Sequence, residues 1–157
     1  MPEAIRILRG LAYAITWRDF WPEKADAFPA DVRDDIQRGQ DVRGPELAWA
    51  ETVRATAFRA SITFFETFDL LICPTVQVRP FPADQFWPRE IDGVSCPTYI
   101  DWIAITYIWS MLGHPALAVP VGFGETGLPV SIQIVGPPRS EARVLAFGRW
   151  VEQALGA

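Results

Sequence analysis

The sequence has few of the side chains that exchange protons near neutral pH. Thirteen of its 14 basic residues are arginine, so Lys24 is the only lysine, and His114 is the only histidine. These two residue types supply many of the general acids and bases of enzymes. Acidic residues number 19, and the net charge is -5. Because nucleic-acid binding depends on neutralising phosphates, the composition argues against nucleic acid as a partner.

Cysteine is also scarce. Cys73 and Cys96 are far apart, and each precedes a proline, so they form neither a C-x-x-C redox motif nor half of a zinc site. We therefore expect no bound metal and no cofactor. Free thiols in a reducing compartment are the favoured interpretation, and a disulfide is the alternative.

Long apolar runs are missing as well. The longest, residues 102–112, is interrupted by Thr106 and Ser110 and is shorter than the roughly 18 residues that a membrane span requires. The first residues lack a basic segment followed by an apolar one, which a secretory signal would show. The expectation is a soluble, cytoplasmic protein without a membrane partner.

The residues that are present favour a folded chain. Half of the 157 residues are apolar and seven are tryptophan, which excludes a disordered tail. A chain of this length buries roughly 68–70% of its unfolded surface, enough for a core without disulfides. The length predicts a single domain spanning residues 1–157.

The first part, residues 1–68, has the apolar spacing of helices. Helices are predicted over 3–21, over 30–38 with Gly39 as a left-handed C-cap, and over 44–68 with Pro45 in the first turn. The second part, residues 69–157, is mixed. A short apolar run at 68–75 predicts a buried strand, and the proline-rich residues 76–97 predict a long loop, either a functional lid or a wrap around a neighbour.

The rest of the second part contains helix and strand patterns. Residues 98–112 are apolar nearly all round and predict one buried helix, with Thr98 as N-cap and Asp101 at the third position; a strand is the alternative. Residues 115–121 and 130–135 predict a β-hairpin whose second strand buries one face, formed by Val130, Ile132 and Ile134. Ser140 is placed to cap a terminal helix. The order of elements indicates the α/β class.

One match to a known motif is false. Gly122, Gly124 and Gly127 fit the G-x-G-x-x-G pattern of dinucleotide sites, and Glu141 lies near the place of a ribose-binding acid. That fingerprint requires a helix to begin at the third glycine, whereas here an alternating strand follows. A hairpin turn is the better interpretation.

The titratable residues give little sign of a catalytic site. His114 lies between Gly113 and Pro115 with no G-x-S-x-G nearby, so we expect a helix-end residue that bonds backbone carbonyls. Lys24 stands between acids, which indicates an exposed ammonium. The acidic pairs 34–35 and 23/26 indicate solvated helix faces rather than catalytic dyads.

Two tryptophans form the only candidate ligand-binding pattern in the residues themselves. Trp102 and Trp109 are seven apart, which places them on the same side of the predicted helix. Aromatic side chains at this spacing usually pack in a core. The alternative is that they form the floor of an apolar ligand pocket.

Three blocks in the second half resemble a known family. Residues 68–75 (FDLLICPT), 112–123 (LGHPALAVPVGF) and 127–137 (GLPVSIQIVGP) closely resemble the C-terminal third of amidase-signature enzymes in both order and spacing. Residues 31–39 and the long helix after them are also similar to the family, so the resemblance covers nearly the whole chain. It implies the C-terminal part of an α/β fold in which a mixed β-sheet is flanked by helices.

The resemblance also implies an activity. Members of this family are hydrolases that cleave amides through a serine acyl-enzyme, and the serine is activated by a second serine and a lysine in a Gly/Ser-rich region upstream of these blocks. This sequence contains no such region, so no catalytic residue is assigned here. Ile108 and Ser110 stand where the family commonly has proline and asparagine. The resemblance places Trp102, Thr106 and Trp109 near the non-scissile part of a substrate, which favours an apolar or aromatic group.

Two hypotheses follow from these expectations. In the first, the chain is the C-terminal portion of an amide hydrolase and is inactive alone, binding a small amide substrate only with the missing catalytic region. In the second, it is a non-catalytic partner or scaffold derived from an amidase. Either would leave strand edges and an apolar face uncovered, so self-association is expected.

Overall fold

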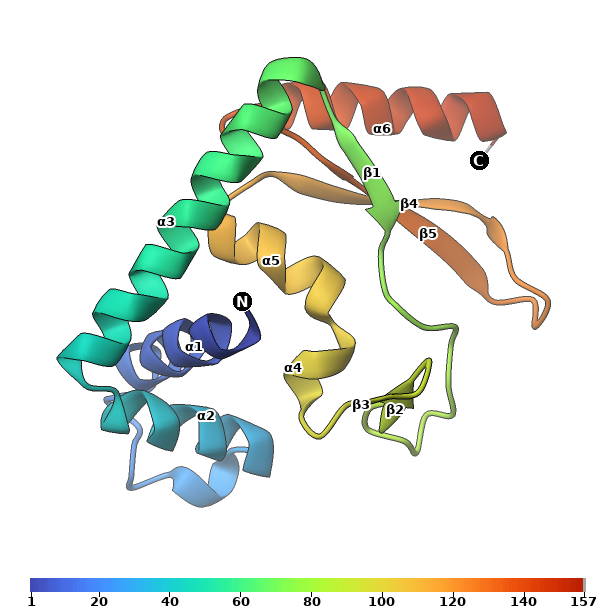
Figure 1. Cartoon of the computed structure of the whole chain (residues 1–157). Coiled ribbons are helices and arrows are strands. Elements are labelled where there is room, and N and C mark those ends of the chain that lie inside the picture. Colours follow the sequence, from blue (N-terminus) through green and yellow to red (C-terminus); the bar gives the residue numbers. More distant parts are fainter. Residues whose placement is uncertain (157) are drawn as a thin grey trace.

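A three-helix group and a small sheet are the two main parts of the molecule (Figure 1). The computed structural model describes residues 1–156. The helical part comprises α1 (Pro2–Thr16), the short 3-10 helix η1 (Ala25–Ala27), α2 (Ala30–Asp41) and α3 (Gly44–Thr67). The long helix α3 runs from this part toward the sheet, where the chain enters β1 (Leu71–Pro74). The predicted helical first part is confirmed, although its first helix ends five residues early.

A close approach of two backbones holds α1 against α2. Gly39 lies inside α2 and is buried, and a Cβ built on it would overlap the carbonyl group of Gly10 in α1. The prediction that Gly39 is a left-handed cap was therefore wrong, because the missing side chain serves helix packing rather than a turn. Beside this contact, Ala4 and Ile7 of α1 pack with Ala50 of α3 in a small apolar cluster.

The sheet is antiparallel and has the strand order β1-β5-β4, where β4 spans Ala116–Phe123 and β5 spans Pro129–Val135. The helix α6 (Glu141–Leu155) covers one face. Its side of the sheet holds a core cluster of Val119, Ile134, Val144 and Val151. This arrangement confirms the predicted α/β class and the hairpin. Gly122 lies in β4, and the turn after it is closed by hydrogen bonds between Gly124 and residues 127–128, so the segment is no dinucleotide loop.

The opposite face of β5 is also buried. Gln133 and Val135 are 4% and 0% exposed, whereas Val130 is 41% exposed. The expectation that only the face of Val130, Ile132 and Ile134 is buried was wrong, because a second helix covers the other side near the end of β5. That helix is α5 (Ala104–Leu112), and the Gln133 side chain donates a hydrogen bond to its Ile105 carbonyl.

The predicted single helix over 98–112 is divided in two. The four-residue helix α4 (Tyr99–Trp102) and α5 are separated at Ile103, whose backbone leaves the helical region at φ -103° and ψ 20°. Both ends match the prediction. Asp101 and Thr98 form a capping box at the start, and Gly113 ends α5 in the left-handed conformation, at φ 73°.

Two smaller predictions are modified by the structure. The predicted loop over 76–97 contains a short hairpin of β2 (Glu90–Ile91) and β3 (Val94–Ser95). Ser140 is the N-cap residue of α6, but its hydroxyl donates to the Pro137 carbonyl (2.6 Å) and makes no capping bond.

Both cysteines are free thiols. Among residues 1–156, no helix is both long and apolar enough to cross a bilayer.

Candidate functional site

A hollow of about 480 Å³ opens where the chain leaves β1. Its walls come from three segments, namely residues 74–81, residues 129–131 at the start of β5, and Trp102 at the end of α4. Most of the lining side chains are apolar, among them Val76, Val78 and Phe81. A concave, largely apolar surface with a few polar groups is typical of a small-molecule site.

Trp102 is the aromatic centre of this hollow. Its ring stands edge-on to Phe81, at 5.5 Å between centroids and 87° between planes, and edge-on to Tyr99, at 5.9 Å and 84°. Such T-shaped pairs fix the orientation of a ring. The Trp102 indole nitrogen and the Thr75 hydroxyl oxygen are buried without a hydrogen-bond partner among residues 1–156.

Thr106 and Trp109 lie on α5 and do not line the hollow. The Thr106 hydroxyl donates to the Ile103 carbonyl one turn earlier (2.8 Å). Trp109 packs edge-on against His114, at 5.9 Å and 83°, on the side of α5 that faces α3 and the sheet. The break at Ile103 separates the two tryptophans, so the expectation that they share one helix face was wrong.

The Cys73 thiol lies in β1 beside Trp109 and Gln133. Partial burial raises its pKa above the ordinary value, and the N–H groups of Gln133 and Trp109 oppose this only in part. Burial likewise raises the pKa of the Cys96 thiol, and the charges of Asp101 and Glu90 add to the effect. Because the thiolate is the nucleophilic form, neither cysteine is activated.

His114 is buried and bonded through both ring nitrogens. Its Nδ1 lies 2.9 Å from the Gly136 carbonyl oxygen, and its Nε2 lies 2.8 Å from the Ser61 hydroxyl. A carbonyl only accepts, so Nδ1 carries a proton toward Gly136. The Ser61 hydroxyl lies between Nε2 and the Phe58 carbonyl, to which it donates at 2.7 Å. The expectation of a helix-end histidine that bonds a backbone carbonyl is confirmed. A catalytic triad would need a carboxylate where Gly136 lies.

Local sequence patterns do not indicate the polar groups that hold the walls in place. Gln133 donates to the carbonyls of Pro74 and Ile105, both at 3.1 Å, and so ties β1 to α5. The Gln77 side chain accepts from the Ile105 amide (2.9 Å). Strand alternation placed Gln133 on the solvent side, and only the position of α5 shows otherwise. Lys24 is exposed, as expected, and far along the chain from these residues.

The sequence and the fold match one family. The family model described as Amidase matches residues 12–145, and the chain belongs to this family. The solved structure of an amidase superimposes on 98% of this chain with a TM-score of 0.81 and 26% identity. A bacterial aryl acylamidase of the amidase-signature family superimposes on 96%, with a TM-score of 0.77 and 26% identity.

Sequence relatives include enzymes with different substrates. An acylamidase of Rhodococcus erythropolis is 38% identical over 105 residues, which are 63% of this chain and 22% of that protein. A glutamyl-tRNA(Gln) amidotransferase subunit of Archaeoglobus fulgidus is 31% identical over 151 residues, covering 90% of this chain and 30% of that protein. This chain covers 35% of the amidase structure and 32% of the aryl acylamidase structure. The chain therefore spans about a fifth to a third of the proteins that it matches.

Proposed function

We propose that this chain is the C-terminal portion of a serine-dependent amide hydrolase and that it has no turnover by itself. The observation that carries the proposal is the match of residues 12–145 to the amidase family combined with the apolar hollow around Trp102. In this proposal the chain provides one wall of the substrate site, and a Ser-Ser-Lys region outside these residues provides the nucleophile.

The titratable groups support the lack of turnover. Lys24 is exposed, both nitrogens of His114 are engaged inside the protein, and the thiol of Cys73 is held in its neutral form. A ligand in the hollow would contact Trp102 and Phe81, which neither attack a carbonyl nor transfer a proton. The wall can bind and orient a substrate, and the bond-breaking step needs other residues.

The substrate class follows from the same wall. Trp102 and Phe81 favour a substrate whose non-scissile part is apolar or aromatic. Thr106 and Trp109 lie on α5 outside the hollow, so the proposal gives them no contact with the substrate. In an active enzyme that includes this chain, Trp102→Ala raises KM for aryl amides, and an unchanged KM would exclude the contact.

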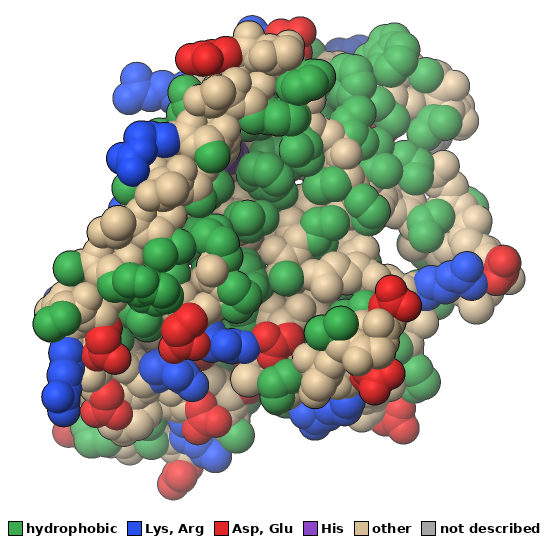
Figure 2. Space-filling model, in the orientation of Figure 1, with side chains coloured by type: hydrophobic (Ala, Val, Ile, Leu, Met, Phe, Trp, Pro, Cys, Tyr) green, Lys and Arg blue, Asp and Glu red, His purple; other side chains and the backbone are tan. Residues whose placement is uncertain are grey.

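An uncovered surface supports a requirement for further protein. β1 and β4 are the two edges of the sheet. Ile72 on β1 is 51% exposed, and Phe68 just before it is 53% exposed. Figure 2 shows apolar side chains gathered between α3 and the sheet, while charged side chains lie over α1 and α2 and on the outer side of α3. We propose that the remainder of an amidase domain covers this surface and that the chain self-associates without it.

The same surface favours a second candidate function. A chain that docks on a separate protein carrying the catalytic region would use these edges as a non-catalytic partner or scaffold. The DNA upstream of Met1 distinguishes the two. An in-frame Gly/Ser-rich segment supports a portion of one hydrolase, and a stop codon followed by a start site supports a separate partner.

Activity and size measurements test the proposal. The purified chain should release no aniline from acetanilide, and light scattering should show particles larger than a monomer. Hydrolysis by the repurified wild-type chain would overturn the lack of turnover. Hydrolysis that persists in the double variant Lys24→Ala/His114→Ala would come from an unexpected site or from a contaminant. A monodisperse monomer at high concentration would contradict self-association.

A further inference from the structure

The position of Trp102 depends on contacts outside its own helix. Helix α4 has only four residues and is separated from α5 at Ile103. A single helical turn is not stable without external contacts. The rings packed on Trp102 are Phe81 and Tyr99, and both belong to residues 81–102, so they brace this stretch internally. Contacts with the rest of the protein come from the buried side chain of Ile100 and from a polar link at the next residue.

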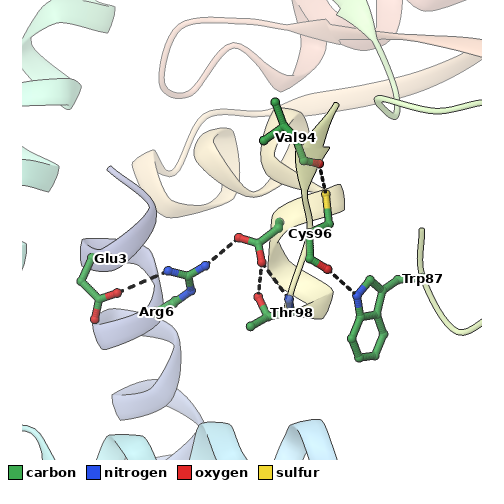
Figure 3. A network of polar contacts seen from close by, with 7 residues as sticks. Glu3, Arg6, Trp87, Val94, Cys96 and Thr98 are labelled. Carbon is green, nitrogen blue, oxygen red and sulfur yellow. Dashed lines mark hydrogen bonds and ion pairs between the residues drawn. The ribbon is translucent and has the colours of Figure 1, made fainter. Parts of the chain in front are cut away.

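Asp101, the residue before Trp102, provides such a link. Its Oδ2 accepts hydrogen bonds from the backbone amide of Thr98 (2.8 Å) and from the Thr98 hydroxyl (2.6 Å). Its Oδ1 accepts from Nη2 of Arg6 in α1, also at 2.6 Å. Figure 3 shows the resulting chain of contacts from Glu3 through Arg6 to the start of α4. One carboxylate therefore caps α4 and joins it to α1.

The ion pair between Arg6 and Asp101 is shielded from solvent. Their side chains are 22% and 17% exposed. A charge-assisted bond of this length in a partly buried place is stronger than an exposed pair. The other partner of Arg6, Glu3, is 53% exposed and lies 3.4 Å away, and Nε of Arg6 has no partner among residues 1–156. Asp101 is thus the main partner of Arg6.

We propose that Arg6, acting through Asp101, is a positioning residue that holds Trp102 in the wall of the hollow and thereby sets the preference for aromatic substrates. The substrate part of this inference rests on the proposed function. Arg6 does not line the hollow, so it acts only through the backbone of α4. Loss of its charge leaves the capping box intact and removes the ion pair between α4 and α1, so that buried Ile100 is the remaining anchor of α4 on that side.

A matched ion pair serves as the control. Arg9, one turn further along α1, bonds Asp35 of α2 through Nε at 2.7 Å, and the two side chains are 24% and 15% exposed. This pair has nearly the same length and burial as that of Arg6 but does not reach α4. An effect on Trp102 that comes from general weakening of α1 would appear in Arg9→Met as well as in Arg6→Met.

The position of Trp102 is measured by 19F NMR of the whole chain labelled with 5-fluorotryptophan, with Trp102→Phe assigning its resonance. In Arg6→Met this resonance should shift and broaden, while that of Trp109 on α5 stays in place. Arg6→Lys should restore the wild-type position in part, and Arg9→Met should leave it unchanged. An unaltered Trp102 resonance in Arg6→Met, or an equal change in Arg9→Met, overturns the proposal. If Arg6→Met does not fold, Asp101→Asn keeps an acceptor for Thr98 and should give the same shift.

The substrate part is decided by kinetics in an active enzyme that includes this chain. Arg6→Met should raise KM for acetanilide several-fold with little change in kcat, and KM for acetamide should stay the same. Equal changes for both amides overturn the role in specificity even if the NMR result holds. If no combination with a Ser-Ser-Lys region is active, the proposed function fails, whereas the NMR measurement still decides whether Arg6 positions Trp102.

Discussion

Ser61 in the middle of α3 and His114 just beyond the end of α5 are joined by a hydrogen bond of 2.8 Å between Oγ and Nε2. The two residues are 9% and 7% exposed. Since the other ring nitrogen bonds Gly136 after β5, one imidazole connects the long helix α3, the end of α5 and the sheet. Phe58, Phe65 and Trp109 pack around the ring at 5.2 to 5.9 Å. The only histidine of the chain is therefore structural.

Removing either partner of this bond should destabilise the fold. Ser61→Ala leaves Nε2 buried without a partner and should lower the free energy of unfolding by about 1–3 kcal/mol. His114→Phe should cost at least as much, because it leaves the Gly136 carbonyl unpaired. In a double-mutant cycle by urea denaturation, the two losses should add to more than the loss in the double variant. Ser110→Ala, on an exposed position of α5, is the control and should have almost no effect.

The contact of α1 with α2 should not tolerate a methyl group. Gly39→Ala places a Cβ against the Gly10 backbone, which cannot turn aside as a side chain would, so the helices must separate. A loss of roughly 1–3 kcal/mol or more is expected in thermal or urea unfolding. Gly44→Ala, where nothing lies within 4 Å of the new Cβ, should change stability little. Equal effects of the two substitutions would contradict the close packing.

Gln133 should contribute more to the stability of the fold than a polar residue on the exposed face of a strand ordinarily does. Gln133→Met keeps the length of the side chain but removes both hydrogen bonds to the Pro74 and Ile105 carbonyls. We expect a loss of about 1–3 kcal/mol in unfolding free energy. Gln153→Met, on an exposed position of α6, is the matched control. A Gln133→Met protein as stable as the wild type would show that these carbonyls need no partner.

Stability should fall in alkaline solution. The pKa values of Cys73 and Cys96 lie above their ordinary 9.0, and that of Tyr107 lies above 10.0, chiefly because of burial. The folded state therefore favours the neutral forms. Their contribution is complete below these ordinary values and is lost as the pH rises through the raised ones. The free energy of unfolding should decrease above pH 9, and Cys96→Ala should reduce that decrease.

Tyr107 reports on the charges at the start of α4. Apart from burial, the Asp101 carboxylate raises its pKa and the Arg6 guanidinium lowers it. Arg6→Met should therefore raise the pKa of Tyr107 further, and Asp101→Asn should lower it. Absorbance at the phenolate band during alkaline titration measures both shifts, with Tyr107→Phe identifying the signal. Shifts of the same sign in the two variants would contradict this arrangement.

Much of the fold could be predicted from local patterns. Apolar spacing and proline placed the long helix within a residue, and the alternating runs around the glycine-rich turn predicted the hairpin. Gly39 was misassigned because a glycine near a helix end looks the same whether it forms a turn or a helix contact. The break at Ile103 was missed because residues on both sides are equally apolar.

The site was less predictable for a physical reason. The sequence pointed to Trp102, and the structure places it in a hollow, but the arrangement around it comes from residues distant in the chain. Arg6 and Asp101 are 95 positions apart, and Gln77 and Ile105 are 28 apart. No local pattern contains such pairings, since they depend on how the helices and the sheet pack.

Because the helix is interrupted at Ile103, α4 and α5 are held in place by different regions of the molecule. The turn that holds Trp102 is joined to α1 through Asp101 and Arg6, whereas α5 is bonded to the sheet through Gln133 and also packs on α3 and α1. A substitution in α1 can thus retune ligand preference while the sheet, and the stability that it provides, stay the same. If Arg6 positions Trp102 as proposed, relatives with different substrates should differ in α1, although no residue of α1 lines the hollow.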